Sequence, residues 1–237
     1  YRAVLADLVD RGLTYECYCS RREVREAAAA PHNDLPEGAY PGTCRSLTEA
    51  QRASHRSRGR APAIRLRTDG SSRRFIDRLA GEISAPLHDQ VLARGDGTPA
   101  YNLVVVIDDA FQDIEEVVRA DDLLASTPGQ VHIADLVGVE PPTYAHVPLV
   151  LGPSGNRLAK RDGSVTLDDR LALGQGPSAV RGWLASSLGL AEPGSAPPMS
   201  ELLDRFDPGA LSTQPWRLSP TDLEGNDPPT SLDLGTG

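Results

Sequence analysis

The sequence predicts an α/β fold built around a parallel sheet. The run YNLVVVIDD, residues 101–109, is the most apolar of the chain and does not alternate, which is typical of a strand buried on both faces. It is followed by a second short strand in residues 113–124, a helix in 125–139 and a third apolar run in 146–152. The order strand, strand, helix, strand is half of a doubly wound sheet. The first run ends in Asp108 and Asp109, which would lie at the C-terminal end of its strand, where such folds bind their ligands.

The segments before this region predict a helix, a strand and a second helix. Residues 1–9 carry apolar side chains at helical spacing, and Gly12 stands where the helix would be capped. Residues 13–19 alternate like a strand and end in a Cys-x-Cys pair. A helix-like stretch in 22–30 is then stopped by Pro31.

Strand patterns return further along the chain, and a helix follows the third apolar run. Residues 63–67 alternate, and residues 73–85 and 90–100 are strand-like, the latter with a Gly-Asp-Gly turn signal. Residues 178–190 place apolar side chains on one side of a helix. From Glu192 onward proline, glycine, serine and acids dominate, so we expect that tail to be largely irregular.

Length and composition bound the class of protein. The chain has 237 residues, of which 39% are hydrophobic, enough to bury a core. Three cysteines are too few for a disulfide scaffold, and no apolar run has the length of a membrane span, so we expect a cytoplasmic protein. Because the chain starts at Tyr1 inside an amphipathic pattern, without a methionine, we also expect that an N-terminal part is missing.

The formal charge of −9 is unevenly distributed. Between Arg45 and Arg78 ten arginines stand against three acids, whereas from Glu192 to the end eight acids stand against two arginines. This asymmetry predicts a basic face for a phosphate backbone and an acidic tail elsewhere. The alternative is a solvated surface in an arginine-biased protein.

Lys160 is the only lysine, whereas 23 residues are arginine. It lies in RLAKRDG, residues 157–163, after the loop signal GPSGN. The use of lysine at this one position indicates a site that needs a compact ammonium group, as phosphate-binding sites do, and not a planar guanidinium. The alternative is that this lysine occurs by chance in a surface loop.

The three cysteines fall within one short window, which suggests a metal site. Cys17 and Cys19 form a Cys-x-Cys pair, and Tyr40 and Cys44 lie four residues apart after an intervening loop. Three thiolates with one oxygen or nitrogen ligand suit Zn²⁺, and chemistry alone leaves Tyr40 and His32 as rivals for the fourth position. The alternative is three free or buried thiols.

The sequence AYNLVVVIDDAFQDIEEVVRADDLLASTPGQ, followed by HVPLVLGPSGNRLAKRDG, resembles the second half of the catalytic domain of glutamyl-tRNA synthetases. These are class I enzymes with a Rossmann-type core, and the likeness runs from Tyr1 to about Leu190. RLAKR stands where that class carries its KMSKS motif, with Ala159 in place of the serine. The resemblance places the HIGH motif before Tyr1, which leaves open whether this chain alone is active.

The resemblance implies a division of the chain. Residues 1–13 would be a helix of the first nucleotide-binding half, and 14–98 a zinc-bearing, arginine-rich insertion. Residues 99–175 would be the second half of the Rossmann-type domain with the KMSKS-like loop. Residues 176–237 would be a C-terminal helix and an irregular acidic tail, with no anticodon-binding domain.

The resemblance also implies roles for particular residues. Tyr101 and Arg119 match positions that bind glutamate, and Lys160 matches the catalytic lysine that holds ATP phosphates. ATP, with Mg²⁺, would contact the KMSKS-like residues Arg157, Leu158, Ala159, Lys160 and Arg161.

The cysteine arrangement resembles the zinc site of the glutamyl-queuosine tRNA(Asp) synthetase branch, which implies Cys17, Cys19, Tyr40 and Cys44 as Zn²⁺ ligands. The expected function is ATP-dependent activation of L-glutamate and its transfer to queuosine in the anticodon loop of tRNA(Asp), by a monomer. Two alternatives stay open. They are a truncated discriminating glutamyl-tRNA synthetase and a catalytically silent, zinc-bearing RNA-binding fragment.

Overall fold

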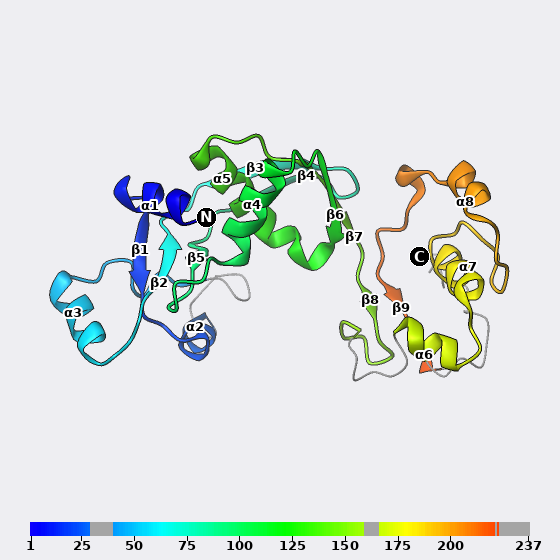
Figure 1. Ribbon diagram of the computed structural model, residues 1–237, viewed down its shortest axis with the longest axis horizontal. Coiled ribbons are helices and arrows are strands. Elements are labelled where there is room, and N and C mark those ends of the chain that lie inside the picture. The colour runs from blue at the N-terminus through cyan, green and yellow to red at the C-terminus, as the bar shows by residue number, and fades with distance from the viewer. Residues whose placement is uncertain (29–39, 159–165, 221, 223–237) are drawn as a thin grey trace. The chain divides into compact units, whose positions relative to one another are not determined.

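The computed structural model of the chain describes residues 1–28, 40–158, 166–220 and 222. The chain divides into two compact units (Figure 1). The first comprises Tyr1–Val117 with Leu123–Ala145, and the second Val118–Asp122 with His146–Gly237. Among the described residues no helix is long and apolar enough to cross a membrane.

The first unit opens with a helix and a three-stranded antiparallel sheet. Helix α1 (Arg2–Asp10) ends before Gly12, whose φ of +70° turns the chain into strand β1 (Thr14–Cys17), as predicted. Strand β2 (Ala63–Leu66) pairs with β1 and with β5 (Val91–Ala93), in the order β1-β2-β5.

The residues described between β1 and β2 include two short helices. Helix α2 (Arg21–Ala28) confirms the predicted helix as far as it is described, while Pro31 lies outside the described residues. Helix α3 (Glu49–Ser57) was not predicted, although Thr48 and Gln51 form a capping box at its start.

The second sheet is mixed, which corrects the prediction of a parallel one. Strands β3 (Ser72–Asp77) and β4 (Gly81–Pro86) form an antiparallel hairpin. The order is β4-β3-β7-β6, and β7 (Thr143–Val147) runs parallel to β3. Strand β6 (Glu116–Ala120) confirms the predicted strand that ends near Arg119.

The apolar run that was predicted as a buried strand is helix α4 (Tyr101–Phe111). Its β-branched residues favour a strand, but Leu103 and Val106 are three residues apart and both face the core. Packing of this stripe overrides the local propensity. Asp108 therefore does not end a strand, and its carboxylate accepts a hydrogen bond from the Tyr1 hydroxyl instead.

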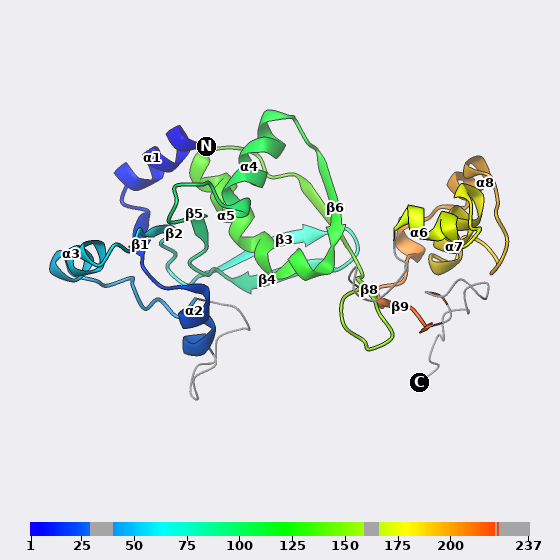
Figure 2. The ribbon, with the colours of Figure 1, turned by 60° about the horizontal axis from the view of Figure 1, so that its bottom comes forward.

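Helices α4 and α5 (Thr127–Val137) pack side by side, and α5 contacts β3 and β4 (Figure 2). Helix α5 confirms the helix predicted in 125–139, with Ser126 at its N-cap and Pro128 in its first turn. The predicted Gly-Asp-Gly turn is also confirmed after β5 by a bond from Arg94 N–H to Thr98 O. One buried apolar cluster of this unit consists of Leu8, Leu66, Leu92, Leu103, Val106, Ile133 and Ala134.

The elements described in the second unit include three helices and a two-stranded parallel sheet. Strand β8 (Val150–Leu151) pairs with β9 (Trp216–Arg217), and Trp183 of the predicted helix α7 (Pro177–Ser187) packs edge to face on Trp216. The second unit also includes α6 (Leu167–Ala172), α8 (Met199–Arg205) and a 3₁₀ turn at Pro208–Ala210. Another 3₁₀ turn, at Asp121–Ser126, follows β6. The tail after Glu192 is thus more ordered than predicted, because α8 and β9 lie within it.

Leu103→Ala should lower the free energy of unfolding by about 2–5 kcal/mol, because Leu103 is fully buried between helices and its truncation leaves a cavity. Phe111→Ala is the matched control on the same helix. Phe111 is 85% exposed, so its truncation should change stability by less than about 0.5 kcal/mol. Urea unfolding followed by circular dichroism measures both, and equal losses would contradict the helical assignment of this run.

Candidate functional site

The three cysteines converge on one point of the first unit. Cys17 ends β1, Cys19 follows two residues later, and Cys44 lies in a turn after Tyr40. Their sulfur atoms all lie within 4.8 Å of one another, and those of Cys19 and Cys44 are 3.5 Å apart. Ligands of a tetrahedral Zn²⁺ at about 2.3 Å lie at similar separations, so the donor set fits this ion.

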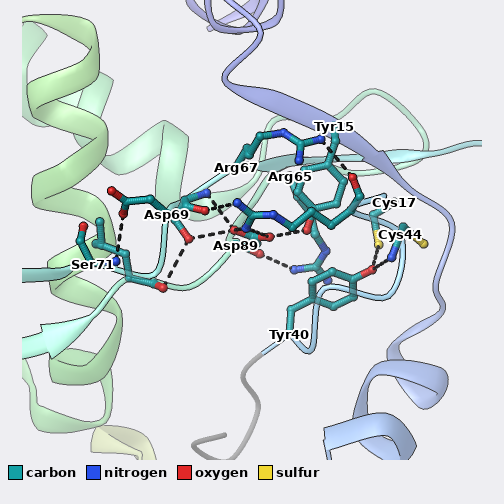
Figure 3. A network of polar contacts seen from close by, with 12 residues as sticks. Tyr15, Cys17, Tyr40, Cys44, Arg65, Arg67, Asp69, Ser71 and Asp89 are labelled. Carbon is teal, nitrogen blue, oxygen red and sulfur yellow. Dashed lines mark hydrogen bonds and ion pairs between the residues drawn. The ribbon is translucent and has the colours of Figure 1, made fainter. Parts of the chain in front are cut away.

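Tyr40 places its hydroxyl oxygen against the same three residues, of which Figure 3 labels Cys17 and Cys44. The oxygen lies 3.4 Å from Cys17 Sγ and 3.6 Å from Cys19 Sγ, and it accepts a 2.7 Å hydrogen bond from the Cys44 backbone N–H. Tyr40 is therefore well placed as the fourth ligand. Its rival His32 lies outside the described residues.

The protonation of this cluster depends on burial and on neighbouring donors. Burial raises the pKa of the Cys19 thiol to about 12 and also raises the pKa of Tyr40. Burial opposes ionisation of Cys44 too, but hydrogen bonds from Tyr40 and from the Tyr18 backbone N–H outweigh it and lower the pKa of that thiol. A bound cation is what would keep all three sulfurs as thiolates.

A buried carboxylate next to the cysteines connects the surrounding segments. Asp89 accepts hydrogen bonds from the Tyr15 hydroxyl at 2.7 Å and from the backbone and hydroxyl of Thr68 at 2.9 and 2.8 Å. Arg45, directly after Cys44, binds both of its oxygens at 3.0 and 2.9 Å. The guanidinium of Arg65 donates to the Asp89 carbonyl and lies 3.8 Å above the Tyr40 ring (Figure 3). None of these supporting residues was predicted.

Most arginines of the predicted basic face are engaged within the chain. In the described part of the chain, seven of them form ion pairs with carboxylates: Arg45, Arg52, Arg56, Arg60, Arg73, Arg74 and Arg78. Their partners include Glu16, Glu23 and Asp135, which lie outside the arginine-rich stretch in the sequence. The local excess of positive charge is therefore smaller than the count along the sequence indicated.

The two residues predicted to bind glutamate are found in different units. Tyr101 is the first residue of α4 in the first unit, and its side chain is half exposed. Arg119 lies on β6 in the second unit, where its Nε donates a 3.0 Å hydrogen bond to Nε2 of the buried His146. His146 was missed, although it is a polar residue at the start of an otherwise apolar run.

The loop predicted before the lysine is present and forms a tight hairpin. Gly152 N–H bonds to Asn156 O at 2.8 Å, and Leu158 N–H bonds back to Val150 O of β8 at 3.0 Å. Arg157 pairs with Asp122 and bridges to Leu151. The other predicted ATP-binding residues, Ala159, Lys160 and Arg161, lie outside the described residues.

These features agree with a comparison with known protein families. Residues 1–184 match the family described as tRNA synthetases class I (E and Q), catalytic domain. The chain therefore belongs to this family of class I aminoacyl-tRNA synthetases, and the predicted resemblance is confirmed.

Within the family, the chain is 52% identical over 223 residues to the Glutamyl-Q tRNA(Asp) synthetase of Nocardia farcinica, covering 94% of this chain and 70% of the relative. It is 40% identical over 190 residues to a Glutamate--tRNA ligase of Synechococcus, covering 78% and 40% of the two chains. In fold it is similar to the crystal structure of a glutamate tRNA ligase from Elizabethkingia meningosepticum, with a TM-score of 0.69 at 22% identity. That match covers 95% of this chain and 50% of the other.

Asp89→Asn should lower the free energy of unfolding at neutral pH by about 1.5–3 kcal/mol, because hydrogen bonds to a buried charge are lost. Burial would raise the pKa of Asp89, but the bonds from Tyr15 and Thr68 and the charge of Arg45 hold it below its usual value. The stabilisation is therefore complete above the unfolded-state pKa of about 3.9 and is lost as the pH falls through the lower folded-state pKa.

Urea unfolding at a series of pH values measures this difference between the wild type and the variant. Asp69→Asn is the control, because Asp69 is exposed and asparagine can still accept its bond from Ser71 N–H. A difference between Asp89→Asn and wild type that persists unchanged far below pH 4 would contradict the role given to the carboxylate.

Proposed function

We propose that the protein containing this chain activates L-glutamate with ATP and transfers it to queuosine in the anticodon loop of tRNA(Asp). The observation that carries the proposal is the convergence of Cys17, Cys19, Cys44 and Tyr40 in a member of this synthetase family. The similarity to a relative named Glutamyl-Q tRNA(Asp) synthetase, over 94% of this chain, supports the same substrate pair.

The proposed roles follow the chemistry of the side chains. The Arg119 guanidinium offers paired N–H donors to a carboxylate, and the half-exposed Tyr101 offers a hydroxyl. Lys160 places an ammonium against the ATP phosphates and stabilises the charge that develops as glutamate displaces pyrophosphate. Arg157, Leu158, Ala159 and Arg161 complete the ATP contacts, with Mg²⁺ on the phosphates.

Zn²⁺ is the metal proposed for the cysteine cluster. When bound it would link the end of β1 to the turn that carries Cys44 and so contribute folding energy to the insertion. Since Asp89 and Arg65 already fix the surroundings of Tyr40 and Cys44, the ligands are held in place from outside the cluster.

One zinc should copurify with each chain, and Cys17→Ser combined with Cys44→Ser should abolish its retention. Tyr40→Phe should weaken zinc binding, because only the ligand oxygen is removed. Tyr18→Phe is the matched control, since the Tyr18 hydroxyl bonds to Glu16 and not to the sulfurs. Elemental analysis of protein purified without added metal measures all of these, and zinc undiminished in the double serine variant would refute the site.

The full-length gene product should attach radiolabelled glutamate to queuosine-containing tRNA(Asp), and the label should survive removal of the 3′ acceptor end. An unstacked anticodon-loop base can be bound in a pocket, whereas acceptor-end charging would place the label on the terminal nucleotide. Lys160→Ala should lower the glutamylation rate by roughly two to three orders of magnitude, the effect of removing a preorganised charge.

Transfer RNA(Asp) that lacks queuosine is the matched control and should remain unlabelled. Label on the 3′ end of tRNA(Glu) would instead favour a truncated glutamyl-tRNA synthetase. Zinc and RNA binding without any glutamate-dependent ATP–pyrophosphate exchange would favour the silent RNA-binding fragment.

A further inference from the structure

His146 is a buried histidine that the proposed chemistry does not use directly. It lies on β7, is 3% exposed, and accepts a 3.0 Å hydrogen bond at Nε2 from the Nε of Arg119 on the neighbouring strand β6. Tyr144 and Ala145 on the same strand are buried as well. The imidazole is therefore shielded from water where it meets Arg119.

This hydrogen bond constrains the guanidinium in a specific way. Because Nε2 of His146 accepts, the imidazole carries its proton on Nδ1 and is neutral. The Arg119 Nε–H points in a fixed direction in the plane of the guanidinium, so the contact orients the whole plane. A carboxylate that binds Arg119 must then use the terminal nitrogens, because Nε is already engaged with the histidine.

We propose that His146 is a positioning residue that orients Arg119 for the carboxylate of the amino-acid substrate. The inference rests on the proposed function, in which Arg119 binds glutamate. His146 itself does not touch the substrate in this proposal. Without the acceptor at Nε2, the long arginine side chain would regain rotational freedom and lose affinity for the amino acid, while ATP binding would be unaffected.

Two variants of His146 in the full-length gene product test this. His146→Phe keeps a ring but removes the acceptor, whereas His146→Gln supplies a neutral oxygen acceptor. In glutamate-dependent ATP–pyrophosphate exchange, His146→Phe should raise the KM for glutamate roughly 10- to 100-fold, as for the loss of a hydrogen bond to a charged group. The KM for ATP should stay within about twofold, and His146→Gln should recover most of the lost affinity.

A double variant separates this role from a merely structural one. If His146 acts through Arg119, His146→Phe should add little to the effect of Arg119→Ala on glutamate KM. Additive losses, or an unchanged glutamate KM in His146→Phe, would overturn the inference. If Arg119→Ala itself leaves glutamate KM unchanged, the proposed function of Arg119 fails first, and the inference fails with it.

A spectroscopic measurement on the wild type reports on the hydrogen bond itself and does not rely on kinetics. The chain has five histidines, so the imidazole nitrogen signals in a ¹⁵N spectrum can be assigned by comparison with His146→Gln. We expect an unprotonated Nε2 and a protonated Nδ1 for His146 at neutral pH. A proton on Nε2 would overturn the inference, because that nitrogen could not then accept from Arg119.

Discussion

The candidate metal centre depends on the burial of one carboxylate. Asp89 is 6% exposed, and a charge removed from water to this extent is stable only with several partners. Its partners come from Tyr15 on β1, Thr68 after β2 and Arg45 beside Cys44. These segments must therefore meet in one arrangement, which brings the end of β1 and the turn with Cys44 together before any metal is considered.

The same constraint explains why the arginine-rich stretch carries less unpaired positive charge than the count of its arginines indicates. Arg45 neutralises Asp89, Arg65 lies over the Tyr40 ring, and Arg67 lies 4.9 Å from the Tyr15 ring centre. Guanidinium groups suit these positions because they are planar, can fork onto a carboxylate and can stack on an aromatic face. Many arginines of this region thus maintain the local fold, and few are left for a phosphate backbone.

The sequence predicted features that depend on residues close together in the chain better than contacts between residues far apart in it. Helix α5 and strand β1 follow from local periodicity, and the three cysteines are rare residues within one short window of the sequence. Tyr40 was preferred over His32 only through the family resemblance. Helix α4 was mistaken for a strand because its β-branched composition hid the three-residue spacing of Leu103 and Val106. Asp89 and His146 were missed because their partners lie 74 and 27 residues away, where no spacing pattern indicates a contact.

The environment of the described arginines also bears on the lone lysine. Arg157 pairs with Asp122, and the hairpin of Gly152–Asn156 is closed on both sides by backbone bonds up to Leu158. Gly155 in this hairpin has a φ of +79°, and a side chain there would meet the Arg217 guanidinium. The chain is thus held in a fixed register until two residues before Lys160. Since arginine serves wherever a fork or a planar face is needed, the use of lysine at this one position is consistent with the proposed contact to phosphate, for which a compact point charge suffices.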